Sequence, residues 1–207
     1  MAIDAGASNS RPATVAITAS SSASTTADIA VTAAPPAPAA CDTAPLAAAV
    51  AAILGAKGAR VGISLAELGG TLPLKWSLNG SAVFDAASTY KLTALMIEAE
   101  GIAAGSIDPN GLVHFEAADY EAGVFDDYSV GVGFSRNVLA YRAGHYSDNT
   151  AGHMLVRDIG GGTALNAWAA ALGATGSSFF DTNATTADDL TALWVAEAGG
   201  KLGGSAA

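Results

Sequence analysis

The chain contains little of three things that would point to common classes of protein: cysteine, positive charge and long apolar runs. Cys41 is the only cysteine among 207 residues, so no disulfide can form within the chain. Lysine and arginine number 9 against 19 acidic residues, and the net charge of −10 argues against binding to nucleic acid or to an anionic membrane surface. No run of about 18 apolar residues is present, so the sequence predicts no membrane-spanning helix.

The histidines do not form a metal-binding pattern. His114, His145 and His153 lack the spacing of metal ligands and have no second cysteine beside them. The sequence therefore predicts neither a metal nor a cofactor. His145 lies two residues before Ser147, which leaves a role in a site open, although a surface position is the interpretation that we favour.

Small residues are abundant, above all at the start of the chain. Residues 1–42 are mostly alanine, serine, threonine and proline, and Pro35-Pro36-Ala37-Pro38 is typical of a stiff linker. Because they offer little bulky apolar surface, we expect a disordered linker there and one domain over residues 43–207. The first residues do not match a signal peptide, because Asp4 stands where basic residues are expected.

Local patterns predict one hairpin followed by a mostly helical run. Asp42 is expected to cap a helix over residues 45–54. Alternation at Val61, Ile63 and Leu65, followed by a return strand over residues 72–78, predicts the hairpin. A helix is expected over residues 87–102. Its predicted apolar stripe is Leu92, Leu95, Met96 and Ala99.

The rest of the chain is predicted to be helical after a segment, residues 103–137, that we interpret mostly as loop. The expected helices cover residues 137–143, 150–158, 164–172 and 187–198. Thr163 is expected to cap the third of these, and Thr185 or Thr186 to begin the fourth.

Two short motifs carry the chemistry. In Ser88-Thr89-Tyr90-Lys91, residues three apart on a helix are neighbours, so Lys91 can reach the Ser88 oxygen and act as the base that a serine nucleophile needs. It can do so only if it is neutral, which requires burial or nearby positive charge. Ser147-Asp148-Asn149 adds a second hydroxyl and an amide. Either motif alone is more often a helix cap, but both together predict acyl transfer on a serine.

The two motifs resemble those of class A β-lactamases and penicillin-binding proteins. The flanking residues agree: residues 59–65 with 84–91 resemble the opening strands and nucleophile helix of that family, and residues 146–151 with 159–161 resemble its second motif. The resemblance implies an α/β (α+β) fold, with an antiparallel sheet beside an all-helical lobe. It also implies a location outside the cytoplasm, and a β-lactam or D-alanyl peptide as substrate.

The resemblance also implies roles for individual residues. Ser88 would be the acylated nucleophile and Lys91 its general base. Ser147 would pass a proton to the leaving nitrogen. Asn149 would bind the side-chain amide of the substrate, and Asp148 would hold the loop.

The sequence departs from the family pattern in two places. The K-[TS]-G strand is missing, because Lys201-Leu202-Gly203 lacks the hydroxyl residue and follows a predicted helix. The loop after the second motif is short and has no glutamate. Asp181 is its nearest carboxylate, for which we favour a turn or capping role. We therefore expect the C-terminal strands and helix of the fold to be missing.

These departures leave other functions open. The chain could be a non-enzymatic relic or half of a split fold. It could also be a penicillin-binding sensor that is acylated without turnover. With strands missing, the exposed sheet edge is predicted to favour self-association.

Overall fold

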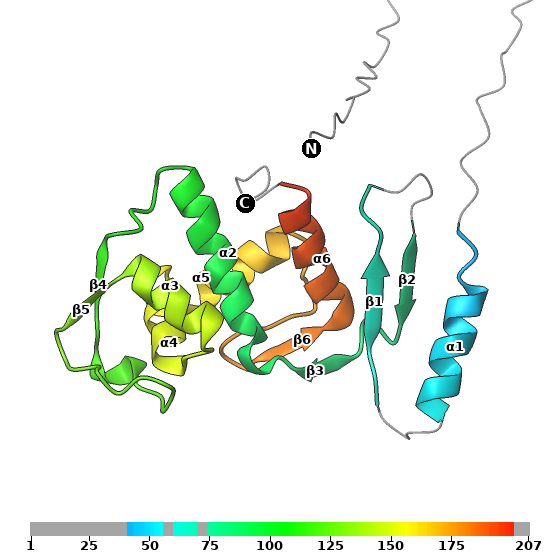
Figure 1. The fold of residues 1–207 in the computed structure, drawn as a ribbon, viewed down its shortest axis with the longest axis horizontal. Coiled ribbons are helices and arrows are strands. Elements are labelled where there is room, and N and C mark those ends of the chain that lie inside the picture. The colour runs from blue at the N-terminus through cyan, green and yellow to red at the C-terminus, as the bar shows by residue number, and fades with distance from the viewer. Residues whose placement is uncertain (1–40, 56–59, 70–73, 201–207) are drawn as a thin grey trace, which may run out of the picture. The chain divides into compact units, whose positions relative to one another are not determined.

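A computed structural model describes residues 41–55, 60–69 and 74–200 of the chain (Figure 1). The predicted linker lies outside the described residues except for its last two positions, and so does Lys201-Leu202-Gly203. The helices are α1 (Ala44–Gly55), α2 (Tyr90–Ala103), α3 (Arg136–His145), α4 (Asn149–Asp158), α5 (Gly161–Ala171) and α6 (Ala187–Ala198), with short 3-10 turns at Ala87–Thr89 and Ala117–Asp119. The strands are β1 (Ile63–Ala66), β2 (Lys75–Leu78), β3 (Val83–Asp85), β4 (Leu112–His114), β5 (Gly133–Ser135) and β6 (Ala184–Thr186).

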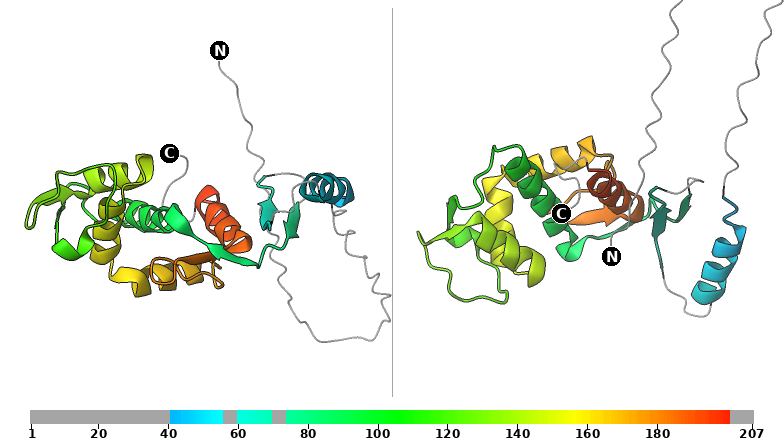
Figure 2. Two further views of the ribbon diagram at one scale, coloured as in Figure 1. Left: turned by 90° about the horizontal axis from the view of Figure 1, so that it is seen from below. Right: turned by 45° about the horizontal axis from the view of Figure 1, so that its top comes forward.

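The first predicted helix and the predicted hairpin are both present. Asp42 Oδ1 accepts a hydrogen bond from Ala44 N (3.0 Å) at the start of α1, as expected of a cap. β1 and β2 pair in antiparallel register, with Leu65 opposite Trp76. β1 contacts α6, as Figures 1 and 2 show. No residue of these two described strands is fully buried.

α2 is the central helix of the helical part and contacts α3, α4 and α5. The predicted apolar stripe is wrong in part: Met96 is buried and Leu92 and Leu95 are half-buried, but Ala99 is exposed. Because other helices pack on more than one side of α2, the buried surface is wider than one stripe and includes polar groups. The buried side chains are Tyr90, Lys91, Thr93, Ala94, Met96 and Glu98.

Residues 103–137 are mostly irregular, as predicted, but β4 and β5 pair there, which was not predicted. Leu112 lies opposite Ser135, and Val113 opposite Phe134. A third pair, β3 with β6, joins segments about a hundred residues apart and was not predicted either. Each strand has three residues, which is too short for an alternating pattern to be recognised. Within the described residues the strands thus form three separate antiparallel pairs.

The predicted helix starts are confirmed at one threonine and not at another. Thr186 caps α6, because its side chain accepts a hydrogen bond from Asp189 N (3.1 Å). Thr163 does not cap α5, which begins two residues earlier at Gly161. Gly160 adopts φ 106°, a left-handed conformation that favours glycine, and this turns the chain from α4 directly into α5.

Two clusters of buried side chains hold the helical part together. The first centres on Leu165, Phe179 and Leu193, and the second on Leu139 and Met154, all of them 0% exposed. The hairpin and the helices together give the predicted α+β class. None of the helices in the described part of the chain is long and apolar enough to cross a membrane.

Candidate active site

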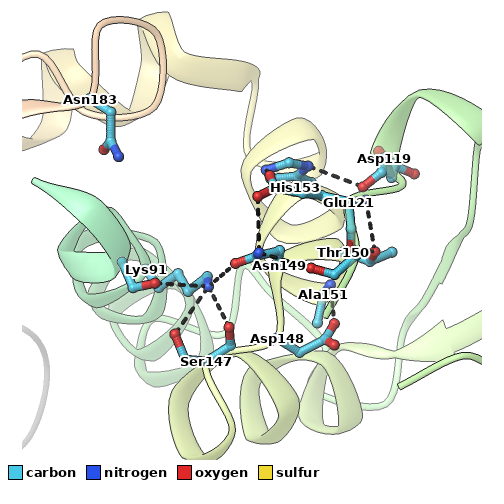
Figure 3. A network of polar contacts seen from close by, with 12 residues as sticks. Lys91, Asp119, Glu121, Ser147, Asp148, Asn149, Thr150, Ala151, His153 and Asn183 are labelled. Atoms are coloured by element: carbon cyan, nitrogen blue, oxygen red, sulfur yellow. Dashed lines mark hydrogen bonds and ion pairs between the residues drawn. The ribbon is translucent and has the colours of Figure 1, made fainter. Parts of the chain in front are cut away.

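The Lys91 amine lies at the centre of both motifs (Figure 3). Its Nζ is 3.2 Å from Ser88 Oγ and 3.2 Å from Ser147 Oγ. It donates hydrogen bonds to the backbone oxygen of Ser147 (2.6 Å) and to Oδ1 of Asn149 (2.6 Å). The structure therefore brings together all four residues that the sequence assigned to the site.

The contacts of Lys91 suit a neutral amine. A neutral amine has two N–H hydrogens and one lone pair, and the two oxygens at 2.6 Å, a carbonyl and an amide oxygen, can only accept. The lone pair is then left for a hydroxyl proton, and Ser88 and Ser147 both offer one. Burial lowers the pKa of Lys91, although the carboxylates of Asp148 and Glu121 act in the opposite direction. Lys91 is 3% exposed, and burial is the largest of these effects.

Strained backbone places both serines against Lys91. Ser147 has φ 56°, and this left-handed conformation lets its carbonyl oxygen and its hydroxyl both face the amine. Ser88 follows Ala87, which has φ 46° and whose N–H donates to Asp85 Oδ1 (2.8 Å). The β3–β6 pair that was not predicted thus fixes the turn that carries the nucleophile.

Asp148 holds the irregular segment before β5. Its Oδ2 accepts from the backbone N–H groups of Val124 (2.9 Å) and Phe125 (3.2 Å), and its Oδ1 from the Tyr128 hydroxyl (2.7 Å) and Ala151 N (2.9 Å). Burial alone would raise the pKa of Asp148, but these hydrogen bonds hold it below its usual value. The carboxylate is 0% exposed and fully used by the fold.

A glycine on α4 allows the close approach of Lys91. A Cβ added at Gly152 would lie 2.9 Å from the Tyr90 hydroxyl and 3.0 Å from Lys91 Cε. Only a residue without a side chain fits there without displacing one of those groups. Burial also raises the pKa of Tyr90, whose buried hydroxyl has no hydrogen-bond partner among the described residues.

A pocket of about 450 Å³ opens beside Ser88, and its lining includes residues that the sequence did not assign to the site, among them Glu121 and His153. Glu121 Oε1 accepts from Asn149 Nδ2 (3.0 Å), and Glu121 Oε2 is paired with His153 Nε2 (3.0 Å). A signal for His153 was present: it lies four residues after Asn149, on the same face of α4. Glu121 sits on an irregular segment, which no periodicity could mark. The lining residues are Ala87, Ser88, Tyr90, Glu121, Asn149, His153, Phe180 and Asn183.

His145, the histidine that the sequence singled out, lies elsewhere. It is exposed at the end of α3 and its ring stacks on Tyr141, with ring centres 5.1 Å apart. It does not line the pocket beside Ser88. The surface interpretation fits this position.

The short loop after α5 reaches the pocket through side chains other than Asp181. Ser178 and Ala184 close the loop with two backbone hydrogen bonds (2.8 and 2.9 Å), and Phe180 and Asn183 line the pocket. Asp181 instead lies against the first turn of α5, since a Cβ at Gly162 would be 2.6 Å from its Oδ2. Among the described residues, no group of three or more His, Cys, Asp or Glu side chains is placed to hold a metal ion.

Comparison with known proteins agrees with this arrangement. The family model described as the β-lactamase enzyme family matches residues 45–204, which include both motifs. The chain belongs to the β-lactamase enzyme family. The search of curated proteins finds no match for this β-lactamase family member.

Solved structures of β-lactamases and of a penicillin-binding protein share the fold. A β-lactamase from Sphaerobacter thermophilus is 30% identical, with a TM-score of 0.64 over 78% of this chain and 64% of that one. A β-lactamase from Xanthomonas campestris is 20% identical, with a TM-score of 0.66 over 78% and 65%. A mutant of PBP-A, solved as its acyl-enzyme complex with penicillin G, is 22% identical, with a TM-score of 0.66 over 76% and 63%. This family member thus spans less than two thirds of the length of each.

Proposed function

We propose that this chain carries a serine acyl-transfer site that acts on β-lactams or D-alanyl peptides through an acyl-enzyme at Ser88. One observation carries the proposal: the buried Lys91 amine contacts the hydroxyls of both Ser88 and Ser147 while its own N–H groups are bound to oxygens that only accept. This arrangement supports a neutral lysine acting as a general base.

The proposed acylation step uses the site residues in turn. Lys91 takes the proton of Ser88 as Ser88 Oγ forms a bond to the substrate carbonyl carbon, which gives a tetrahedral oxyanion. The C–N bond of the substrate then breaks, and the leaving nitrogen takes a proton from Ser147. Lys91 returns a proton to Ser147, since its Nζ lies 3.2 Å from both hydroxyls. Asn149 fixes the amine by accepting one of its N–H groups.

Deacylation is proposed to be the slow step. The loop that lies beside Ser88 contributes Phe180 and Asn183 to the pocket, whereas its carboxylate Asp181 points to α5. A positioned general base is worth roughly 10²–10⁴ in rate. We therefore expect Ser88 to be acylated readily and the acyl group to be released slowly. A penicillin-binding sensor is accordingly the second candidate function. A location outside the cytoplasm is likewise proposed from the family alone.

Labelling of the chain by a fluorescent penicillin, followed by intact-mass measurement, tests the proposal. We expect one penicillin per chain on wild type and none on Ser88→Ala. A mass increase that survives in Ser88→Ala would overturn the assignment of the nucleophile, and no labelling of wild type would favour the non-enzymatic alternative. Nitrocefin kinetics then separate the two acylating functions: a burst of one equivalent with little turnover indicates a sensor, and steady turnover a hydrolase.

A further inference from the structure

The Asn149 amide has no free donor with which to bind a substrate. Its Nδ2 donates to Glu121 Oε1 (3.0 Å) and to the backbone oxygen of Ala122 (3.2 Å), and its Oδ1 accepts from Lys91 (2.6 Å). A side-chain amide carries two N–H hydrogens, so both are used. A neutral acyl carbonyl must therefore displace one of these oxygens before Asn149 can bind it.

Glu121 is held in place but keeps acceptor sites free. Asn149 binds its Oε1, and His153 Nε2 contacts its Oε2 (3.0 Å). His153 is fixed in turn, because its Nδ1 lies 3.1 Å from the backbone oxygen of Asp119, which can only accept. Since Nδ1 is then the donor, Nε2 donates to Glu121 only when the ring carries a proton on both nitrogens. A carboxylate has about four acceptor sites, and these contacts use two of them. The Glu121 side chain is 53% exposed, so the remaining sites are open to a ligand.

Three aromatic rings line the pocket beside that carboxylate. The rings of Tyr90, Phe180 and His153 pack edge to face or tilted, with ring centres 5.1 to 6.4 Å apart. All three line the same pocket as Ser88 and Glu121. Glu121 is the only carboxylate among the lining residues, and aromatic faces attract cations as well.

We propose that Glu121 is an ammonium-binding residue, and that the site prefers acyl donors whose acyl side chain carries a protonated amino group. Such a donor binds Glu121 directly and does not need a free N–H from Asn149. The substrate class is then a β-lactam with an amino-bearing side chain, or a D-alanyl peptide with a free amino group. This inference rests on the proposed acyl transfer at Ser88.

Three penicillins that differ at one substituent test the preference. Ampicillin, benzylpenicillin and carbenicillin carry an ammonium, a hydrogen and a carboxylate at the same carbon of the acyl side chain. The second-order rate constant for labelling Ser88 is measured by intact mass at about pH 7, below the usual α-amino pKa of roughly 8. We expect ampicillin to label Ser88 fastest, benzylpenicillin more slowly and carbenicillin slowest. The rate constant for ampicillin should be about ten times that for benzylpenicillin, as one hydrogen bond to a charged group typically gives.

Two variants separate Glu121 from the general charge of the chain. In Glu121→Gln the ratio of ampicillin to benzylpenicillin is expected to fall to about one, because the amide keeps the acceptor for Asn149 but loses the charge. Asp126→Asn removes the same charge from an exposed position on the same segment, and is expected to keep the wild-type ratio. At about pH 9, where the ampicillin amine is neutral, the wild-type ratio should also approach one.

The outcomes distinguish this inference from the function on which it rests. Labelling of Ser88 with equal rates for all three compounds overturns the inference alone. So does an unchanged ratio in Glu121→Gln with slower release of both acyl groups, which would make Glu121 a deacylating base. If no compound labels wild type, the acyl-transfer proposal fails, and equilibrium binding to Ser88→Ala decides the remainder: tighter binding of ampicillin than of benzylpenicillin supports an ammonium site, and equal binding overturns it.

Discussion

The residues around Lys91 and those of the β1–β2 hairpin are held in the molecule in opposite ways. Lys91 is 3% exposed and Asp148 is 0% exposed, and both are hydrogen-bonded by several groups from the helical part. In the hairpin no residue of the two strands is fully buried, and Leu65 is 40% exposed. The groups proposed for acylation thus come from α2 and the 3-10 turn before it, which β3 holds, and from α4 and the loop before it. Within the described residues, none of the hydrogen bonds to these groups comes from β1 or β2.

Removal of the Lys91 amine is the strongest test of this comparison. We expect Lys91→Met to lower the rate of acylation of Ser88 by about 10²–10⁴, the usual worth of a positioned general base. The variant should still fold, because methionine fills a similar volume and removes a buried polar group. Stopped-flow labelling and thermal melting measure the two effects. A variant that is labelled at the wild-type rate would show that another group takes the Ser88 proton.

Truncation of one aromatic residue in each region tests the difference in packing. Phe179 is 0% exposed, and Phe179→Ala is expected to cost about 3–5 kcal/mol. Trp76 is only half-buried on β2, so Trp76→Ala should cost clearly less. The free energies of unfolding in urea decide the matter. Equal losses would mean that the hairpin is as well covered as the helical core, which would also weaken the prediction that its edge favours self-association.

The sequence predicted which residues meet around Lys91 better than it predicted their surroundings. Ser88 with Lys91 and Ser147 with Asn149 were recognisable because the spacing within each motif is local. Asp148 caps α4 in the ordinary way, whereas α2 begins without a side-chain cap. Glu121, His153 and Asn183 were missed because tertiary folding brings them to the pocket from separate segments. The β3–β6 pair was missed for the same reason, and because three residues are too few to show alternation.

Arginines in the two regions give the next comparison. Arg157 donates from Nε and Nη2 to Asp119 (2.8 and 3.0 Å), a carboxylate that is 3% exposed. Arg157→Ala leaves this buried charge unpaired and should cost about 3 kcal/mol, toward the low end of the range because Arg157 is one-third exposed. Arg60 donates to Val83 O (3.0 Å), and Arg60→Ala should lower the free energy of unfolding by about 1 kcal/mol or less. Chemical denaturation of both variants checks the order.

Arg157 also pairs with the segment that leads to Glu121, through Asp119 and Glu116. If Arg157→Ala loosens this segment, the preference for ampicillin should weaken while Ser88 stays reactive. An unchanged preference would show that Asn149 and His153 hold Glu121 without help from Arg157.

Filling the space beside Lys91 tests how closely α4 must approach. Gly152→Ala introduces a methyl group 2.9 Å from the Tyr90 hydroxyl and 3.0 Å from Lys91 Cε, so we expect a loss of about 1–3 kcal/mol in stability, together with slower acylation. Gly55→Ala is the control, because nothing lies within 4 Å of a Cβ there and alanine favours helix. Faster labelling of Gly152→Ala would contradict the tight placement of the amine.

The pH dependence of stability gives the finest test of the buried amine. Burial lowers the pKa of Lys91 in the folded chain, so between that value and the ordinary lysine pKa of about 10.4 the unfolded chain binds more protons than the folded one. The free energy of unfolding therefore gains a contribution as pH rises through this window, and acylation should speed up there as Lys91 becomes neutral.

The comparison of Lys91→Met with wild type measures this contribution. The free energy of unfolding of Lys91→Met should exceed that of wild type most at about pH 7, and the difference should be smaller near pH 10. Lys75→Met, which replaces an exposed lysine on β2, provides the matched control. An advantage of Lys91→Met that grows with pH would mean that the folded state prefers the ammonium, and the lysine could then not serve as the base.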